Sequence, residues 1–393
     1  MRKFTASMLV LIALLVILGS SLAAFARSTS NVASVDPLTT HFAYPDFILK
    51  TKLGSVAPNF SGFTPAQFNK AYGVNLLTNR GAGITVGIID ACGNPNAQTD
   101  LNKYDTTYGL PATTITVVKP QGTPCSDPNG WGVETDLDVQ MVHAIAPRAR
   151  IVLEEARSAS FSNLLGAAKD AYNNRGATVV SMSFGGGEFS GETSATADGI
   201  FSVGNAKGVS FTASSGDSGC GSQYPAASPF VTSVGGTTLK TTTSGGYLSE
   251  TAWSGSGGGL SIFETRPSYQ NGFNSHASRG IPDVAMVANP STGVIVYDKS
   301  VGGFIVVGGT SVAAPMWAGV LAIADAGRTS SMKNADKELY NVASSATKYA
   351  SDYHDIKSGS AGGVCKAGTG YDLVTGLGSP VSNHLVPDLV AAP

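Results

Sequence analysis

The sequence predicts an α/β fold whose central sheet is mostly parallel and is flanked by helices on both faces. The segment GITVGIID (83–90) is almost continuously apolar, as expected of a strand buried on both sides of a parallel sheet. Further along the chain, short apolar segments alternate with helical patterns, which indicates parallel strands joined by helices. The 393 residues contain no internal repeat and no linker, so one large domain is expected.

The expected elements follow one another with recognisable ends. The first helix is expected in FTPAQFNKAYGV, where Thr64, Pro65 and Gln67 make a capping box with proline at the first helical position. A helix over 161–176 is expected to end at Gly176, because glycine commonly terminates helices. Further strands are expected at 149–156, 177–187, 209–219, 230–239, 292–298 and 302–311, and further helices at 131–147, 196–208 and 311–327.

The N-terminus has the three parts of a secretory signal peptide. Charged MRK precedes the apolar run MLVLIALLVIL, and a small-x-small pattern precedes a cleavage site after Ala26. The run has 11 residues, whereas a membrane span needs about 20, so cleavage is favoured over an uncleaved anchor. We therefore expect a signal peptide at 1–26, a secreted, extracellular protein, and no stable membrane association after cleavage. Residues 27–60 are expected to be a short pro-segment or N-terminal arm ahead of the main domain at 61–393.

Composition narrows the class of protein. Charged residues make up 13% of the chain, against about 25% in an ordinary globular protein, and 48 residues are glycine. A surface with few ionised carboxylates has few ion pairs to lose on protonation, which suits a secreted protein that must survive acid. The net charge of −2, without a basic run, gives no indication of a nucleic-acid partner, and a monomer is expected.

Four cysteines occur in the chain, and an even count in an exported protein indicates two disulfides. Three pairings are possible for four cysteines. We expect Cys92–Cys125 and Cys220–Cys365, with the other two pairings left open. The absence of a C-x-x-C motif argues against a zinc or thioredoxin-type site.

The segment WGVETDLDVQMVHAIAP carries two carboxylates on one face of the expected helix. At about 100° per residue, Asp138 lies about 40° from Glu134, among the apolar side chains of that face. Like charges on an inward face repel, so one carboxyl is expected to keep its proton to higher pH, which suits acid–base catalysis. Asp136, Gln140 and His143 are expected on the opposite, solvated face. The alternative is a solvated turn whose acids only favour the helix N-terminus.

Two further motifs hold a candidate nucleophile and a candidate hydrogen-bond donor. In GGTSVAAPMWAG, Ser311 lies between a glycine turn and a helix of small residues, so its hydroxyl is presented at a helix N-terminus. In FTASSGDSGC, Asp217 follows an expected strand at the edge of the sheet where ligands bind. A protonated aspartate there can donate to an oxyanion. The structural alternatives are a helix cap at Ser311 and a plain loop turn at Asp217.

These pieces occur together, in this order, in a known family. From about Phe63 to its end, the chain resembles the sedolisins, the serine-carboxyl peptidases. ETDLD resembles the family's E-x-x-x-D, SSGDSG its aspartate loop and GGTSVAAP its G-T-S-x-x-x-P nucleophile turn, while YPAASPFVTSVGGT is similar to the segment between the last two. Each motif alone has low specificity, but their combined order and spacing is specific.

The resemblance implies a subtilisin-like fold and a secreted endopeptidase that hydrolyses polypeptides at acidic pH. It implies an acyl-enzyme on Ser311, with Glu134 as the base. Asp138 would hold Glu134 and share its proton, and a protonated Asp217 would be the oxyanion donor. The dipole at a helix N-terminus favours the same roles, because it stabilises both the alkoxide and the oxyanion.

The resemblance also implies a substrate-binding strand and a metal loop. The strand SMSFGGG would pair with extended substrate backbone. Its expected substrate-binding residues are Ser183, Phe184 and Gly185. The stretch HDIKSGSAGGVCKAGTGYDLVTGLGSP resembles the family's loop for one structural Ca²⁺, which takes oxygen ligands. Its expected ligands are the carboxylates of Asp355 and Asp372 and the carbonyls of Ile356, Gly368 and Gly370, the alternative being a glycine-rich surface loop.

The chain departs from the family in the length of the segment before its first helix. Sedolisins usually carry a large folded prodomain, whereas about 35 residues separate the expected cleavage site from the first helix. Either the chain folds without an intramolecular chaperone, or 27–60 acts as a short inhibitor.

Two other functions are alternatives. A histidine-type subtilase would need a histidine in an H-G-T or H-G-H setting. The sequence has no such histidine, so Asp90 is expected to be a structural residue. An inactive binding protein would have no reason to keep all four catalytic residues.

Overall fold

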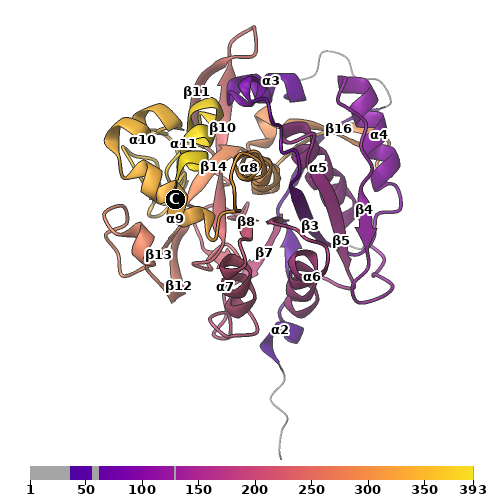
Figure 1. Ribbon diagram of the computed structural model, residues 1–393, viewed down its shortest axis with the longest axis horizontal. Coiled ribbons are helices and arrows are strands. Elements are labelled where there is room, and N and C mark those ends of the chain that lie inside the picture. The colour runs from indigo at the N-terminus through magenta and orange to yellow at the C-terminus, as the bar shows by residue number, and fades with distance from the viewer. Residues whose placement is uncertain (1–35, 55–61, 128–129, 393) are drawn as a thin grey trace, which may run out of the picture. The chain divides into compact units, whose positions relative to one another are not determined.

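The computed structural model describes residues 36–54, 62–127 and 130–392, and Figure 1 shows its ribbon. The expected signal peptide at 1–26 lies outside the described residues. So do 27–35 and 55–60, the two ends of the expected pro-segment or arm. From Pro37 onward the chain is a single unit by its internal contacts.

A sheet of mostly parallel strands forms the centre of this unit. Its strands are β3 (Thr85–Ala91), β4 (Thr116–Val118), β5 (Arg150–Ala156), β6 (Val179–Met182), β8 (Ser210–Ser214), β10 (Thr232–Thr241), β11 (Tyr247–Ala252) and β14 (Val284–Val287). They lie in the order β11-β10-β8-β6-β3-β5-β4, with β14 parallel to β10. β11 runs antiparallel to β10, and β3 is buried along its whole length. The α/β fold predicted from the sequence is confirmed.

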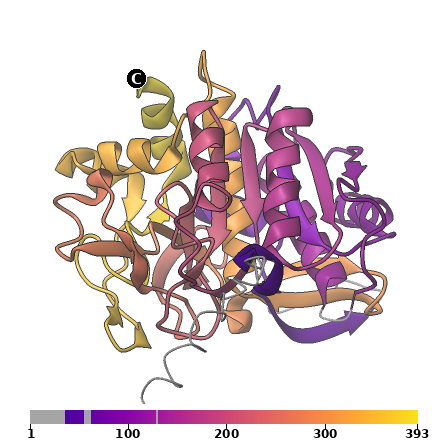
Figure 2. The same cartoon turned by 90° about the horizontal axis from the view of Figure 1, so that it is seen from below.

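Helices cover both faces of the sheet, as the alternating pattern predicts. They are α3 (Pro65–Ala71), α4 (Ala97–Tyr108), α5 (Trp131–Ile145), α6 (Phe161–Asn174), α7 (Asp198–Ala206), α8 (Thr310–Asp325), α9 (Ala335–Ala343), α10 (Ala346–Asp352) and α11 (Ser382–Ala391). Figure 1 places α5 and α8 on one side of the strands, and α6 and α7 on the other. Figure 2 shows α6 and α7 side by side. Two apolar cores result, one containing Leu137 and Trp317 and the other Phe161 and Phe201.

Two helix ends follow the predicted local chemistry. The backbone N–H of Thr64 donates to Gln67 Oε1 at 2.9 Å, which completes the capping box at the start of α3. Gly176 follows α6 with a φ of +73°, a conformation that glycine adopts without steric cost. These signals are local, so the sequence alone is sufficient to find them.

Three strands form a separate antiparallel sheet, which differs from the parallel arrangement expected for 292–298 and 302–311. β15 (Val294–Asp298) pairs with β16 (Gly303–Gly308), whose other edge pairs with β2 (Ile48–Gly54). The physical reason is the short connection between β15 and β16, because a parallel crossover requires a dozen or more residues. This sheet packs against α5.

The whole circumference of α5 is buried, so the solvated face predicted for Asp136, Gln140 and His143 is wrong. Gln140 Nε2 donates to the Tyr297 carbonyl oxygen at 2.7 Å, and its Oε1 accepts from the Tyr297 N–H at 2.9 Å. His143 Nε2 lies 2.8 Å from the Pro111 carbonyl oxygen. The polar side chains of this face therefore bond to the hairpin and loop that cover it rather than to solvent.

Two disulfides are present, and their pairing is the one expected: Cys92–Cys125 and Cys220–Cys365. The second joins residues 145 positions apart, and so ties the loop after β8 to the C-terminal part of the chain.

The remaining elements are short. They are the helix α2 (Pro37–Thr40), the strands β1 (Tyr44–Pro45), β7 (Phe184–Gly187), β9 (Gln223–Tyr224), β12 (Gly259–Thr265), β13 (Ser278–Ile281), β17 (Tyr353–His354), β18 (Ser360–Gly362), β19 (Cys365–Lys366) and β20 (Ser379–Pro380), and the 3₁₀ turns Val74–Leu76, Ser268–Gln270 and Pro290–Thr292.

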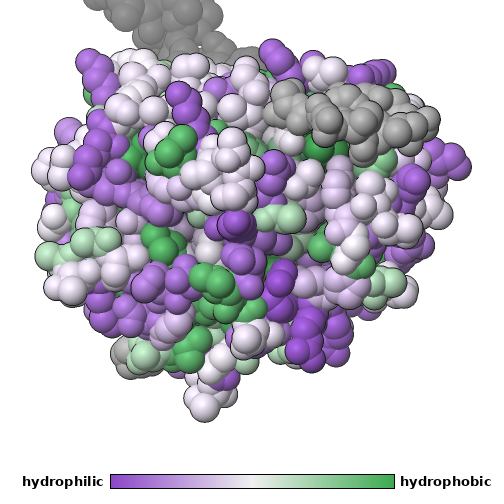
Figure 3. All heavy atoms as spheres, turned by 90° about the horizontal axis from the view of Figure 1, so that it is seen from above, coloured by the Kyte–Doolittle hydropathy of each residue, from purple (hydrophilic) through white to green (hydrophobic). Residues whose placement is uncertain are grey.

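Apolar side chains on the face seen in Figure 3 occur in small groups among polar ones. Scattered exposed apolar residues of this kind are normal for folded proteins. Within the described part of the chain, no helix combines the length and the apolar character needed to cross a membrane.

Candidate active site

The four side chains predicted to be catalytic lie around the contact between two helices and the carboxyl ends of the central strands. Glu134 and Asp138 project from α5, Ser311 lies in the first turn of α8, and Asp217 follows β8. α5 packs against α8, which brings the two acids to the N-terminus of the serine helix. Ser311 and both α5 acids are fully buried, and Asp217 is partly exposed. The carboxyl edge of a parallel sheet is the usual ligand site of such folds.

Glu134 and Asp138 interact one helical turn apart. Burial raises the pKa of both carboxyls well above the ordinary range, and the charge of Asp138 raises the pKa of Glu134 further. The Ser183 hydroxyl donates to Asp138 Oδ1 at 2.6 Å, and this bond, together with the interaction with Glu134, lowers the pKa of Asp138. Asp138 is therefore the easier of the two to ionise, and the pair can hold one proton between them.

Asp90 belongs to the same buried group of acids, although the sequence pattern indicated only a structural residue. It lies in β3, which α5 crosses, and its charge raises the pKa of both Glu134 and Asp138. Burial raises the pKa of Asp90 itself to about 8, against a lowering by the neighbouring Thr135 side chain. Asp90 is thus neutral in acid. Its position at a strand end was visible in the sequence, but its proximity to α5 was not.

Ser311 has its backbone and side chain both directed into the site. Its Oγ donates to the Ser183 carbonyl oxygen at 3.1 Å. The Ser311 side chain also interacts with Glu134, which lowers the pKa of that carboxyl. A serine hydroxyl becomes a nucleophile when an adjacent base takes its proton, and Glu134 is in that place.

The two carboxylate oxygens of Asp217 have different surroundings. Its Oδ1 accepts from the Thr310 N–H at 2.7 Å and from the Thr310 hydroxyl at 2.9 Å. Its Oδ2 has no partner among the described residues and lies against Gly309, where a Cβ would clash with it. Burial raises the pKa of Asp217 well above the ordinary range. A protonated Oδ2 would therefore be a donor beside the Ser311 N–H, as an oxyanion hole needs.

The loop predicted to bind calcium brings Asp355 and Asp372 to one glycine-rich segment. The Gly370 N–H donates to Asp355 Oδ1 and the Gly368 N–H to Asp372 Oδ2, each at 3.0 Å. Lys357 Nζ lies 3.4 Å from Asp355 Oδ2. Two carboxylates with glycine carbonyls around them are the hard oxygen donors that suit Ca²⁺.

A second group of acids could hold a cation. Carboxylate oxygens of Asp100, Asp136 and Asp298 all lie within 4.8 Å of one another in the part of the chain described. Asp136 and Asp100 also interact with each other, and burial with the two neighbouring charges raises the pKa of Asp136 well above the ordinary range. A shared proton therefore stabilises this cluster in acid without a metal ion.

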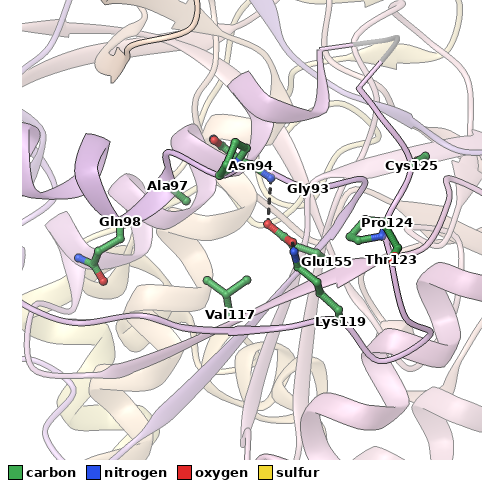
Figure 4. Close-up of a pocket in the computed structure, with 11 residues that line it drawn as sticks. Gly93, Asn94, Ala97, Gln98, Val117, Lys119, Thr123, Pro124, Cys125 and Glu155 are labelled. Carbon is green, nitrogen blue, oxygen red and sulfur yellow. Dashed lines mark hydrogen bonds and ion pairs between the residues drawn. The ribbon is translucent and has the colours of Figure 1, made fainter.

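A surface cavity of about 370 Å³ lies beside the Cys92–Cys125 disulfide (Figure 4). The Asn94 N–H donates to Glu155 Oε1 at 2.9 Å, and Lys119 Nζ lies 3.5 Å from Glu155 Oε2. The carboxylate in its wall is thus already neutralised by partners. None of the four predicted catalytic residues lines this cavity, so it is separate from the site built by α5 and α8.

Comparison with known proteins identifies the family. Residues 81–357 match the Subtilase family. The chain is 32% identical to sedolisin of Pseudomonas sp. (strain 101), over 81% of this chain and 60% of that protein. It is also 32% identical to kumamolisin of Bacillus sp. (strain MN-32), over 86% of this chain and 65% of that protein. It thus spans less than two thirds of the length of either relative.

A solved structure decides the branch of the subtilase family. The structure of Pseudomonas sedolisin, described as a serine-carboxyl proteinase, is 30% identical to this chain and has a TM-score of 0.75. The match covers 84% of this chain and 98% of that one. The chain belongs to the sedolisin family. The subtilisin-like fold that the sequence motifs implied is therefore confirmed.

One further residue of this sedolisin-family site was not found from the sequence. The strand containing Phe184 and Gly185 pairs with the chain's own N-terminal segment, β1, rather than facing solvent. Beyond β1, the Asp46 carbonyl oxygen accepts a hydrogen bond of 3.0 Å from the Ser311 N–H. An aspartate after a proline in an irregular segment gives no pattern that would predict this contact.

Proposed function

We propose that this chain is a serine-carboxyl endopeptidase that hydrolyses polypeptides at acidic pH. The observation that carries the proposal is the position of Glu134, which is buried, lies on α5 and interacts with the Ser311 hydroxyl at the start of α8. A buried acid in that position is the base that a serine nucleophile needs. The partly paired carboxyl of Asp217 supplies the second element of acyl transfer, a donor for the oxyanion.

Each step of hydrolysis has a residue to perform it. Ser311 Oγ attacks the carbonyl carbon of the peptide bond while its proton passes to Glu134, whose own proton moves to Asp138. The Ser311 N–H and the protonated Asp217 donate to the oxyanion. The carbon–nitrogen bond then breaks, the leaving amine takes a proton back from Glu134, and an acyl-enzyme remains on Ser311. Water then attacks this ester while Glu134 takes its proton, the proton passes back to Ser311 Oγ, and the acyl group leaves as a carboxylic acid.

The buried acids explain why the activity would be confined to acid. Asp217 donates only while it carries a proton. Burial makes it unfavourable for several carboxyls of the site to be ionised at once, and this applies to Asp90, Glu134, Asp138 and Asp217. As pH rises, ionisation of Asp217 removes the donor and adds a negative charge where the oxyanion forms. Both effects lower the rate.

Endopeptidase action is supported by the path of the chain's own N-terminal segment. Asp46 contacts the Ser311 N–H through its carbonyl oxygen. The chain before Asp46 forms β1, which pairs with β7, and the chain after it forms β2, which pairs with β16. A polypeptide therefore passes through the cleft in both directions from Ser311. A cleft that was blocked a few residues from the serine, as an exopeptidase needs, would not hold this path.

The test is hydrolysis of an unfolded protein across acid and neutral pH, by the full chain and by Ser311→Ala, with product masses recorded. Internal fragments formed in acid by the wild type alone would support the proposal. The competing function is an inactive binding protein of the same fold. A peptide aldehyde separates the two, because only an activated serine forms the hemiacetal. Absence of both hydrolysis and aldehyde adduct would reject the enzyme.

One structural calcium ion is proposed for the C-terminal loop. The proposed ligands are Asp355, Ile356, Gly368, Gly370 and Asp372, the first and last through carboxylates and the others through carbonyls. Hydrogen bonds from Gly368 and Gly370 already hold both carboxylates on one loop, which supports a shared site. The ion would neutralise two neighbouring negative charges and fix the loop away from the chemistry.

Secretion is proposed from the leader-like N-terminus together with the two disulfides. Disulfides persist in oxidising compartments and are rare in the cytosol. The same two bonds would hold loops around the sheet in an extracellular medium where the pH is low. Recovery of the protein from culture medium, with a new N-terminus after Ala26, would test this part.

A further inference from the structure

The cavity beside the Cys92–Cys125 disulfide has a pair of opposite charges in its wall (Figure 4). Lys119 Nζ lies 3.5 Å from Glu155 Oε2, and the two side chains differ in exposure, at 54% for Lys119 and 3% for Glu155. The cavity volume of about 370 Å³ is within the range of small-molecule sites in proteins. The cavity can therefore hold a small charged ligand.

The sheet places an apolar side chain on the same face as the charged pair. β4 is the edge strand beside β5, and Val117 lies opposite Leu153 in this parallel pair. Side chains alternate along a strand, so Lys119 and Glu155, each two residues further on, lie on that same face. Val117 is 44% exposed. The cavity thus offers an apolar surface next to one positive and one negative group.

The two oxygens of Glu155 differ in their partners. The Asn94 N–H donates to Oε1 at 2.9 Å, whereas Oε2 accepts no hydrogen bond among the described residues. Asn94 is itself fixed, because its Nδ2 donates to the Gly132 carbonyl oxygen and to Asp136 Oδ2, each at 3.0 Å. A buried carboxylate oxygen without a donor is unfavourable. Glu155 Oε2 is therefore a preformed acceptor for a ligand.

Lys119 is a weak partner for this oxygen. An N···O distance of 3.5 Å is longer than an ordinary hydrogen bond, and an ion pair with an exposed lysine contributes little in water. A ligand ammonium at hydrogen-bond distance would make a stronger contact with Glu155. The long, flexible side chain of Lys119 would then be free to pair with a negative group of the same ligand.

Space for the ligand ammonium exists beside Gly93. A Cβ at this position would lie 3.1 Å from Glu155 Oε2 and 3.5 Å from Pro124 Cγ, so glycine leaves room between the carboxylate and Pro124. The segment with Pro124 is anchored by the disulfide and by a hydrogen bond of 2.9 Å from the Cys125 N–H to the Arg157 carbonyl oxygen. This wall of the cavity is therefore fixed and presents an apolar ring.

We propose that this cavity binds a free aliphatic α-amino acid. Its ammonium group donates to Glu155 Oε2, its carboxylate pairs with Lys119, and its side chain lies against Val117 and Pro124. The two charged groups of an α-amino acid are attached to one carbon, so they match two adjacent protein charges. A simple amine would satisfy only Glu155, and a simple carboxylate only Lys119. Binding does not depend on catalysis by Ser311, because none of the four predicted catalytic residues lines the cavity.

A bound amino acid would stabilise the folded chain. A ligand that binds the folded state alone shifts the unfolding equilibrium by mass action. The ligand is small and the cavity is open at the surface, so a dissociation constant of about 1–10 mM is expected. Free amino acids are the end products of protein digestion. If the chain is the peptidase proposed above, it would become more stable where such products accumulate.

The first test compares L-valine with two molecules that share its side chain and lack one charge, isobutylamine and 3-methylbutanoate. Saturation-transfer NMR titrations at pH 6 use the full-length Ser311→Ala chain, which prevents self-digestion. L-valine is expected to bind at least about tenfold more tightly than either, because each of them loses one charge-assisted hydrogen bond. Equal affinity of L-valine and isobutylamine, or no transfer to L-valine at about 50 mM, would overturn the proposal.

The second test changes the two charged side chains in the same Ser311→Ala background. Lys119→Met and Glu155→Gln are each expected to weaken L-valine binding at least about tenfold. Lys337→Met, at an exposed lysine on α9, is the matched control and should bind L-valine like its parent. Lys119 is exposed, so Lys119→Met decides the question by itself if Glu155→Gln does not fold. Unchanged affinity in Lys119→Met would overturn the proposal.

Isobutylamine shows whether Lys119 acts on the ligand carboxylate. Its affinity for Lys119→Met is expected to equal or exceed that for the parent, because the lysine no longer competes for Glu155. An equal loss for L-valine and isobutylamine would overturn the assignment of the carboxylate to Lys119.

Thermal unfolding gives an independent measure of binding. L-valine at about 100 mM is expected to raise the melting temperature of the parent by about 2–5 °C more than that of Lys119→Met. An equal rise in both proteins would be a general solvent effect and would overturn the proposal. None of these measurements depends on peptidase activity, so their failure leaves the proposed function untouched.

Discussion

The backbone N–H of Ser311 donates a hydrogen bond of 3.0 Å to the carbonyl oxygen of Asp46. This contact joins the predicted nucleophile to a segment that is far away in the sequence and precedes the first helix of the main domain. It fixes which carbonyl lies between the Ser311 N–H and Asp217. The segment 37–53 therefore marks the path of a polypeptide through the site, and the proposed catalytic roles can be tested around that path.

Asp217→Asn is expected to extend activity toward neutral pH. Asparagine keeps an oxygen for Thr310 and places an amide donor where Asp217 Oδ2 lies, so it donates without needing a proton. In acid it should retain activity within about tenfold of the wild type, whereas Asp217→Ala should lose about 10²–10³ in kcat. The pH dependence of kcat for the three proteins checks this. An unchanged fall toward neutral pH in Asp217→Asn would show that another group controls that limb.

Ser183→Ala is expected to lower kcat and to move the acidic limb of the rate profile to higher pH. The Ser183 hydroxyl donates to Asp138 Oδ1 and lowers the pKa of Asp138, so its removal makes that acid harder to ionise. The hydrogen bonds that the Ser183 carbonyl accepts from the Asp46 N–H and the Ser311 hydroxyl are kept. Ser181→Ala is the matched control, because Ser181 is a buried serine whose Oγ has no partner among the described residues. Equal profiles for both variants would contradict the role of Ser183 in positioning Asp138.

The folded protein is expected to lose stability as pH rises from about 4 to about 8. Burial raises the pKa of Asp90 and of Asp336 from 3.8 to about 8. Between these values the folded state holds protons that the unfolded chain releases, so raising the pH favours unfolding. For each such carboxyl, the free energy of unfolding falls by about 1.4 kcal/mol per pH unit across this range. The stabilisation is complete below the unfolded pKa and is lost as pH passes through the folded one.

Urea unfolding at a series of pH values measures this dependence. Asp90→Asn should flatten the curve, because asparagine has no proton to release. Stability that was constant or rose over the same range would contradict the assignment of buried, neutral carboxyls.

Chelation of calcium is expected to lower the melting temperature without abolishing folding in acid. Removal of the ion would leave two carboxylates on one loop, those of Asp355 and Asp372, and Lys357 forms an ion pair with Asp355 alone of the two. Asp372→Asn should reproduce the loss and make the protein insensitive to chelator. A melting temperature unaffected by chelator and restored calcium would reject the site.

Local signals in the sequence were sufficient for most of the fold and for the motifs that are predicted to be catalytic. The capping box at Thr64, the apolar strand at β3 and the glycine turn before Ser311 depend on neighbouring residues, so each can be recognised without the rest of the chain. The spacing of Glu134 and Asp138 on one helix is of the same kind.

What could not be predicted depends on contacts between distant segments. The face of α5 that carries Gln140 is buried because the β15–β16 hairpin packs over it, and the helical period does not reveal this contact. Asp90 joins the acid cluster only because α5 crosses β3. Asp46 reaches Ser311 only because an irregular segment adds a strand to β7.

The most direct test of the account is the pH profile of protein hydrolysis by Glu134→Gln beside the wild type, with Glu338→Gln on α9 as a matched control. Glutamine keeps the shape of Glu134 but cannot take the proton of Ser311, so kcat is expected to fall by about 10³–10⁴ at every pH while the fold is kept. The control should follow the wild type. Activity in Glu134→Gln close to that of the wild type would contradict the assignment of Glu134 as the base that activates Ser311.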